Sequence, residues 1–262
     1  MNRGKGASAR LRRSRYAGIF IALCVVHGGP AVAQSAYFDA ANVQRWASGR
    51  YAYISTRTGE QNGDEDWLLT VHADGSRTLQ STNSYNDHTR TWRNVVLRVA
   101  PDFRPLEAHL TFWVDGAWRG SGWFTVDGNE LRGQVSGPGG RIEQTLAVPE
   151  HFSLVPHPIA TDSWPTWYYD YARGGLQKVT LYAFDGQALG PDSMLGKLNE
   201  TEIEYRGKQT IEIPAGTFET EHFVFAGGDP QLYLVGEDRI IAKMTWQRAE
   251  VEYVLTAYAS GP

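Results

Sequence analysis

Cysteine is almost missing from this chain, because its 262 residues include only Cys24. Cys24 lies in an apolar N-terminal stretch and follows Leu23, whereas the acylated cysteine of a lipoprotein follows a small residue at the cleavage site. The chain that follows this stretch has no thiol, which excludes a disulfide, cysteine-ligated zinc and a thiol nucleophile there. At this length a hydrophobic core buries enough surface to need no such support.

Motifs of the common enzyme classes are also missing. The sequence has no Gly-x-Ser-x-Gly elbow, no phosphate-binding loop and no dinucleotide glycine fingerprint, so it gives no support for a hydrolase, a kinase or a nicotinamide-dependent dehydrogenase. No histidine spacing indicates zinc. Asp64, Glu65 and Asp66 do not have the spacing of a calcium-hand loop, and we interpret them as a solvated acidic turn. We therefore expect no cofactor and no metal.

The first 33 residues have the three parts of a secretory signal peptide. Residues 1–15 are basic without an acidic residue, an apolar stretch of roughly ten residues follows, and Ala31-Val32-Ala33 forms a small-x-small cleavage site. The apolar stretch is shorter than the roughly 20 residues that cross a bilayer. The sequence predicts cleavage before Gln34 and a periplasmic or secreted protein without stable membrane insertion. The export route stays open.

Removing this leader makes the protein distinctly acidic. The leader holds six of the 25 lysine and arginine residues and none of the 29 acidic residues. An acidic surface repels phosphate backbones and anionic lipid headgroups. We therefore expect no nucleic-acid partner and no peripheral membrane binding.

From Gly49 onward, short runs rich in valine, isoleucine, threonine and aromatic residues alternate with turn signals roughly every 8 to 12 residues. Asp-Gly turns favour antiparallel hairpins. The sequence predicts one mainly β domain over residues 34–262, built as a curved antiparallel sheet or half-open β-barrel with one or two short helices. Strands are expected near 50–57, 66–72, 76–83, 91–99, 106–114, 117–126, 129–135, 141–148, 175–184, 196–206, 208–213, 217–226, 231–235, 238–246 and 250–259.

Two segments have helical features. Residues 36–47 carry three apolar residues loosely on one side and end before Gly49. In residues 162–172, Asp162 or Ser163 is a candidate cap and Pro165 suits a first helical turn. We expect this second helix to separate two sets of strands and to pack across the sheet.

Two segments near the C-terminus carry a family resemblance. The run Ile213-Pro214-Ala215-Gly216-Thr217-Phe218-Glu219-Thr220 and the later Gly236-Glu237-Asp238-Arg239-Ile240-Ile241-Ala242-Lys243-Met244 resemble a family of exported bacterial proteins of unknown function. That family is similar to the lipoprotein-carrier superfamily. The resemblance covers about the last 60 residues. It implies a half-open antiparallel barrel with a hydrophobic ligand on its concave side, and it assigns no catalytic residues.

The Asp115-Gly116 turn sets the register of the hairpin around it. That register pairs Trp113 with Trp118, Thr111 with Gly120 and His109 with Gly122. The opposite face, with Ala108, Leu110, Phe112, Val114 and Trp123, is expected in the core. Glycines in strands often mark the close approach of a ligand. His109, Trp113 and Trp118 are therefore candidates for a ligand-binding wall, and the alternative is a tryptophan pair that stabilises an exposed hairpin.

The segment from His151 to Tyr171 is the densest polar and aromatic cluster. Pro156 and Pro158 restrict His157, which Asp162 could orient as a general base, with Tyr168 as a further acid–base group. The alternative is that Asp162 caps the helix and His157 bonds to backbone. Trp164 and Trp167 are expected to line the cavity.

Three functional hypotheses follow. The first is a periplasmic binding or carrier protein for an apolar, aromatic or lipid-like small molecule in a tryptophan- and tyrosine-lined barrel cavity. The second is a cofactor-independent lyase, isomerase or hydratase that uses His157, Asp162 and Tyr168. The third is an envelope structural or assembly protein whose aromatic residues form a core. The sequence names no ligand and does not decide between turnover and carriage.

Overall fold

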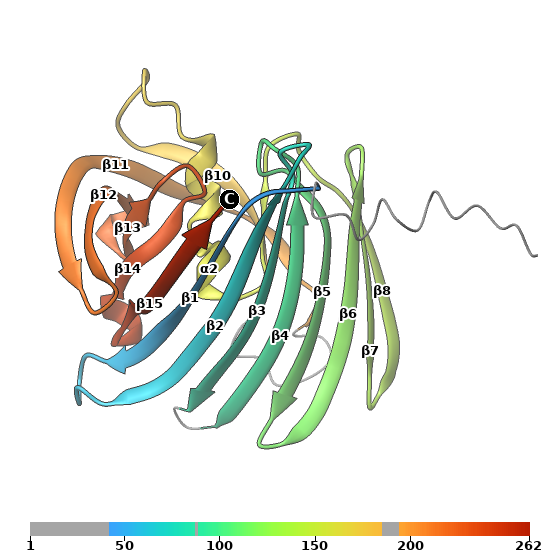
Figure 1. The fold of residues 1–262 in the computed structure, drawn as a ribbon. Coiled ribbons are helices and arrows are strands. Elements are labelled where there is room, and N and C mark those ends of the chain that lie inside the picture. The colour runs from blue at the N-terminus through green and yellow to red at the C-terminus, as the bar shows by residue number, and fades with distance from the viewer. Residues whose placement is uncertain (1–41, 87–88, 185–193) are drawn as a thin grey trace, which may run out of the picture. The chain divides into compact units, whose positions relative to one another are not determined.

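The computed structural model describes residues 42–86, 89–184 and 194–262 (Figure 1). Three features of the sequence lie outside the described residues: the leader predicted over 1–33, the first part of the helix expected over 36–47, and Asp185-Gly186, one of the Asp-Gly pairs that favour a hairpin turn.

The described chain folds into one large curved sheet, which confirms the mainly β fold class. The sheet has 15 strands in the order β8-β7-β6-β5-β4-β3-β2-β1-β15-β14-β13-β12-β11-β10-β9. All neighbours pair antiparallel except β9 and β10. The sheet is not closed into a barrel by backbone pairing between β8 and β9. The strands are β1 (Val43–Ser55), β2 (Gln61–His72), β3 (Arg77–Asn86), β4 (Arg90–Val99), β5 (Pro105–Val114), β6 (Ala117–Asp127), β7 (Glu130–Gly137), β8 (Gly140–Ala147), β9 (Ser153–Val155), β10 (Gln177–Ala183), β11 (Lys197–Ile213), β12 (Gly216–Phe225), β13 (Gln231–Val235), β14 (Ile240–Trp246) and β15 (Val251–Gly261).

The strand positions follow the turn chemistry closely. In the β5–β6 hairpin, Asp115 and Gly116 have φ angles of 51° and 79°, the positive values that a two-residue hairpin turn with right-handed strand twist requires. The strands expected over 196–206 and 208–213, in contrast, are not separate: β11 runs through Arg206 and Gly207 with a shift of register beside Gly207. The break expected between these two strands is wrong, because a glycine inside a strand also serves as a bulge.

The helix expected over 36–47 is wrong for residues 43–47, which belong to β1. These residues pair with β2 on one side and, from Trp46 onward, with β15 on the other. Three loosely spaced apolar residues fit the period of a helix as well as that of a strand. Pairing with both β2 and β15 favours the strand.

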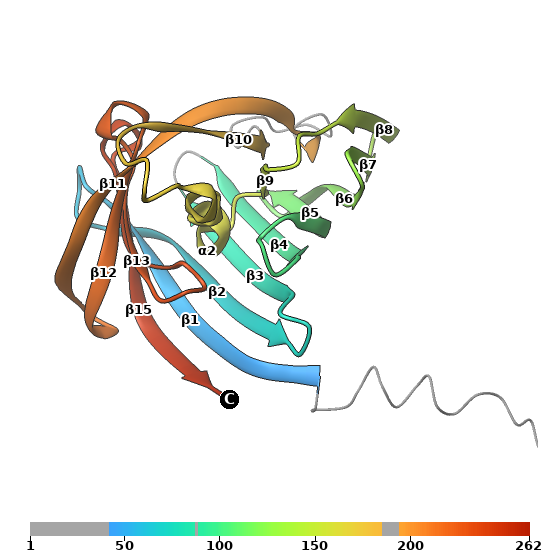
Figure 2. The ribbon, with the colours of Figure 1, turned by 90° about the horizontal axis from the view of Figure 1, so that it is seen from above.

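The expected helical segment between the two sets of strands exists but is shifted and shorter than predicted. It consists of α2 (Ile159–Asp162) and the 3-10 helix η2 (Trp164–Tyr168), with Pro165 in the first turn of η2. Neither Asp162 nor Ser163 caps it through a side-chain hydrogen bond. Seen from above, α2 lies inside the curve of the sheet (Figure 2).

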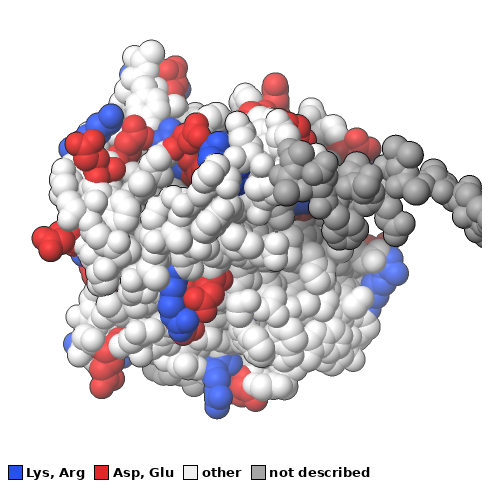
Figure 3. Space-filling model, viewed as in Figure 1, with Lys and Arg blue, Asp and Glu red and all other residues white. Residues whose placement is uncertain are grey.

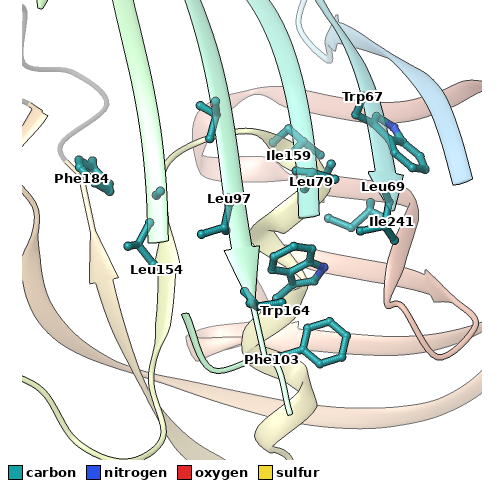
Figure 4. Packing of buried hydrophobic residues seen from close by; sticks show 14 of the residues in the cluster. Trp67, Leu69, Leu79, Leu97, Phe103, Leu154, Ile159, Trp164, Phe184 and Ile241 are labelled. Carbon is teal, nitrogen blue, oxygen red and sulfur yellow. The ribbon is translucent and has the colours of Figure 1, made fainter. Parts of the chain in front are cut away.

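Aromatic and aliphatic side chains fill the concave side around this helical segment. Phe103, from the β4–β5 connection, packs its ring 5.5 Å from that of Trp164 and 4.7 Å from that of Trp167. Ile159 and Trp164 are buried together with Leu79 and other inward residues of the strands (Figure 4). The helical segment and these side chains therefore occupy the space where the sequence predicted a central cavity.

Side chains connect β8, at one end of the strand order, to β10, the second strand from the other end. The Tyr182 hydroxyl on β10 donates to Gln144 Oε1 on β8 at 2.6 Å and accepts from the Gly196 amide at 2.8 Å. A Cβ at position 196 would lie 2.7 Å from the Tyr182 ring, so only glycine fits there. We call this contact the seam, since it links β8 to β10 without a backbone ladder.

Candidate functional site

The predicted tryptophan hairpin forms, but with a different register beyond its first pairs. Trp113 lies opposite Trp118 as predicted. A bulge follows, so His109 lies opposite Trp123 rather than Gly122, and Thr111 lies opposite Ser121 rather than Gly120. The bulge inserts one residue into β6 and reverses the faces of the residues after it.

The bulge puts Trp123 on the outer face, with 51% of its surface exposed. The prediction that Trp123 joins the core is therefore wrong. Its predicted companions are in the core as expected: Ala108, Leu110, Phe112 and Val114 are all buried.

The sequence-predicted tryptophans consequently divide between two sides of the sheet. Trp113 and Trp118 lie on the outer face with His109. Trp164 is buried against Phe103, and Trp167 beside it is 37% exposed. The structure does not gather these five residues around one cavity.

The turn between β13 and β14 carries part of the resembling motif and makes long-range polar contacts. Asp238 accepts hydrogen bonds from Arg45 on β1 and Arg77 on β3. Arg239 forms an ion pair with Glu221 on β12, and its carbonyl oxygen accepts from the Ser163 hydroxyl. The turn is thereby held against three strands and the helical segment.

A groove of about 330 Å³ lies between η2, strands β11 to β13 and this turn. We call it the η2 groove. Its apolar lining includes Trp167 and Leu234. Its polar lining includes Lys208, Glu219, Glu221 and Arg239. Another groove, of about 480 Å³, lies on the far side of the turn beside Asp238, Arg45 and Tyr258, but it contains no residue that the sequence singled out for binding.

The charges in the η2 groove are partly compensated. Besides its ion pair with Arg239, Glu221 accepts a hydrogen bond from the Tyr171 hydroxyl at 2.7 Å. Burial, together with this bond, raises the pKa of Tyr171 to about 12, so the phenol stays a donor. Among the described residues, Lys208 and Glu219 have no ion-pair partner. These two charges are therefore available to a ligand.

Most residues of this groove carry no functional signal in the sequence. Arg239 had a signal, because it stands in the Asp-Arg pair of the resembling motif. Glu221 and Lys208 had none, since only the pairing of β11 with β12 brings them face to face.

The acidic residues at 64–66 do not form a solvated turn, so that interpretation is wrong. They lie within β2, where side chains alternate between faces. Asp64 and Asp66 therefore point outward and bind Arg50, whereas Glu65 points inward and is fully buried.

Glu65 is held at the start of the helical segment. Its carboxylate accepts from the Tyr53 hydroxyl at 2.6 Å and from the amides of Ile159 and Ala160 at 2.7 and 3.1 Å. Burial raises the pKa of Glu65 to about 7. Burial also raises the pKa of Asp162, at the end of α2, and the nearby Glu65 charge adds to that shift. The negative charges of Glu65 and Asp162 thus oppose each other.

His157 and Tyr168, the other two predicted acid–base residues, form hydrogen bonds with backbone carbonyl oxygens. The His157 Nε2 lies 2.6 Å from the carbonyl oxygen of Phe184, and the His157 carbonyl accepts from Asn83. His157 borders a cavity of about 20 Å³. Tyr168 donates to the carbonyl of Phe152 at 3.2 Å, and burial raises the pKa of its phenol.

A large curved sheet wrapped around a helical segment defines a β-barrel-like protein. The structure is similar to a β-barrel-like protein of the domain of unknown function DUF1849 from Brucella abortus, with a TM-score of 0.54 and 11% identity over 84% of this chain and 98% of that chain. It is also similar to a DUF1089 family protein from Pseudomonas aeruginosa, with a TM-score of 0.41 and 14% identity over 68% of this chain and 87% of that chain.

No protein-family model and no curated protein matches the sequence. At 11% identity the likeness to the Brucella abortus protein shows the fold alone. Within the described ranges, no helix has the length and apolar character that crossing a membrane demands.

Proposed function

We propose that this is a binding protein for an apolar or aromatic small molecule that is seated in the η2 groove. The observation that carries the proposal is the groove itself, where Trp167 and Leu234 stand beside the Arg239–Glu221 ion pair. Its volume of about 330 Å³ falls within the range of small-molecule sites. The exposed part of the Trp167 indole supplies affinity at roughly 25 cal/mol per Å² of apolar area buried. Lys208 and Glu219 orient a polar end of the ligand.

The sequence adds two supports. The resemblance of residues 213–220 and 236–244 to an exported family related to lipoprotein carriers implies a hydrophobic ligand, and Arg239 of the second segment borders the groove. The leader in residues 1–33 favours a periplasmic or secreted protein. N-terminal sequencing of the exported protein tests the location, with Gln34 expected as the first residue.

A fluorescence titration tests the binding proposal. The neutral probe N-phenyl-1-naphthylamine is added to the protein and to two variants, Trp167→Ala and Trp118→Ala. Both tryptophans are similarly exposed, at 37% and 41%, but only Trp167 lines the groove. We expect saturable binding that Trp167→Ala weakens at least tenfold and that Trp118→Ala leaves unchanged. No saturable binding, or equal binding by all three proteins, would refute the proposal.

The second candidate is a cofactor-independent acid–base enzyme. It is favoured by the pKa of Glu65, which burial raises to about 7, since a carboxyl group protonated near neutral pH serves as a general acid. It has less support than binding, because the cavity beside His157 has room for about one water. Under this candidate, His157→Ala and Asp162→Asn each abolish turnover while the fold is retained. Loss of the fold instead would indicate structural roles.

A further inference from the structure

The outer face of β4 to β6 carries exposed aromatic side chains that the core does not use. We call this surface the outer aromatic face. It consists of Trp92, His109, Trp113, Trp118 and Trp123. Trp92, Trp118 and Trp123 expose 48%, 41% and 51% of their surface. A monomer rarely leaves so many large rings together in water unless they bind something.

Strand pairing arranges these rings in two rows. Trp92, Trp113 and Trp118 stand side by side on three neighbouring strands, and the rings of Trp92 and Trp113 are 5.3 Å apart. In the second row, His109 and Trp123 lie side by side with ring centres 5.6 Å apart. The rows are four residues apart on β5, which is about 13 Å along a strand.

The row between them is polar and uncharged. It consists of Asn94, Thr111 and Ser121, which register as direct neighbours. Toward β2 it continues into an open groove of about 370 Å³, lined by polar Gln80, Thr82 and Asn94 and by apolar Leu68 and Val96 among others. Amides and hydroxyls thus form one continuous row across the sheet, with apolar side chains on either side of it.

Charge on this side of the protein is sparse (Figure 3). Asp66, which borders the open groove, is bound to Arg50. Arg98 and Glu107, next to the second aromatic row, form an ion pair at 2.8 Å. The charges that border the open groove and the second aromatic row therefore compensate one another, which favours a neutral ligand.

We propose that the outer aromatic face binds a neutral oligosaccharide chain. The C–H faces of sugar rings stack on the exposed indoles, and sugar hydroxyls bond to Asn94, Thr111 and Ser121. Two aromatic rows about 13 Å apart require a ligand longer than one sugar ring to contact both, which suits a chain of several units. This site lies on the opposite side of the sheet from the η2 groove and does not depend on it.

The same features disfavour other occupants. Nucleic acid requires a surplus of lysine and arginine, which this face lacks. An interface between two copies of the chain would have a continuous apolar centre, whereas here the centre is the Asn94–Thr111–Ser121 row.

Isothermal titration calorimetry tests the proposal with two neutral hexasaccharides, chitohexaose and maltohexaose. The protein is compared with Trp123→Ala and Trp92→Ala on this face and with Trp167→Ala in the η2 groove. We expect saturable binding of at least one hexasaccharide, weakened at least tenfold by each outer substitution and unchanged in Trp167→Ala. Thermal unfolding verifies that each variant folds, and Trp123→Phe, which keeps an aromatic ring, is expected to retain part of the affinity.

Two results would overturn the proposal. The first is that neither hexasaccharide binds; if Trp123→Ala then changes self-association in sedimentation, or binding to phosphatidylethanolamine–phosphatidylglycerol vesicles, the face binds a second copy or a membrane instead. The second is hexasaccharide binding that persists in both outer variants. Neither of these results bears on the η2 groove, so the two proposals fail separately.

Discussion

Asp238, on the turn between β13 and β14, accepts a hydrogen bond at 2.8 Å from the Nε of Arg77 on β3, 161 residues earlier in the chain. The Arg77 guanidinium also lies 4.2 Å from the centre of the Phe103 ring, which packs against Trp164 and Trp167. One ion pair thus connects the turn that borders the η2 groove to the aromatic cluster under the helical segment.

Removal of this carboxylate is expected to destabilise the fold. Asp238→Ala leaves the Arg77 side chain, which is 7% exposed, without its ionic partner, and breaking a buried pair in this way costs about 3 kcal/mol. Urea unfolding measures the loss. The control is Asp66→Ala, whose pair with Arg50 is largely exposed and should change stability by less than about 1 kcal/mol. Equal losses in the two variants would contradict the assignment.

Glu65 should make the protein less stable as the pH rises. Its pKa in the folded protein is about 7, above that of the unfolded chain, so the folded state holds the proton more tightly. The free energy of unfolding therefore decreases from about pH 4.3 up to about pH 7, by roughly 3 kcal/mol. Asp162, whose pKa is also raised, acts in the same direction.

The measurement is urea unfolding at a series of pH values. Glu65→Gln keeps a hydrogen-bonding side chain without a titrating group, so its stability should vary less between pH 5 and 7 than that of the unsubstituted protein. An unchanged pH profile in this variant would show that Glu65 is not the titrating group.

Loss of the Tyr182 hydroxyl, which forms the seam, is expected to destabilise the sheet locally. Tyr182→Phe removes both the bond to Gln144 and the bond from the Gly196 amide. A loss of about 1 to 3 kcal/mol is expected, because buried partners are left unsatisfied. Hydrogen exchange should accelerate in β8 and around residue 196 and stay unchanged in β1. Uniform acceleration across the sheet would instead indicate global destabilisation without a seam.

Gly63 and Gly139 differ in how much space surrounds them. A Cβ at Gly63 would lie 2.5 Å from the backbone oxygen of Ser84 and 2.7 Å from the Tyr53 ring. Gly63→Ala should therefore lower stability by about 1 to 3 kcal/mol through overpacking. Gly139 has open space around it, and Gly139→Ala should stay within about 0.5 kcal/mol of the unsubstituted protein. Thermal unfolding of the pair checks the contrast, and comparable melting temperatures would disprove it.

Much of the strand pattern was predictable from local sequence. The predictions failed where strand pairing determines the face of the sheet on which a residue lies. Alternation placed Leu110 and Phe112 in the core correctly. The bulge that moved Trp123 to the outer face depends on how β6 pairs with β5, which local alternation does not record. The three residues of β9 were too few for a strand pattern.

The candidate site was less predictable than the fold. Trp167 was found because aromatic residues cluster around it in the sequence. Glu65 was misinterpreted because two acidic neighbours masked its alternation with Trp67 and Leu69 on the inward face. The strand period alone would have placed all three on one side.

The order of apolar runs and turn residues by itself determined that this chain forms a curved antiparallel sheet, because strand and hairpin signals act over a few residues. Only the tertiary structure decided that Arg77 meets Asp238, that the helical segment occupies the concave side, and that the tryptophans divide between two faces. The physical reason is that these features depend on contacts between residues distant in sequence, whose energies no local pattern contains.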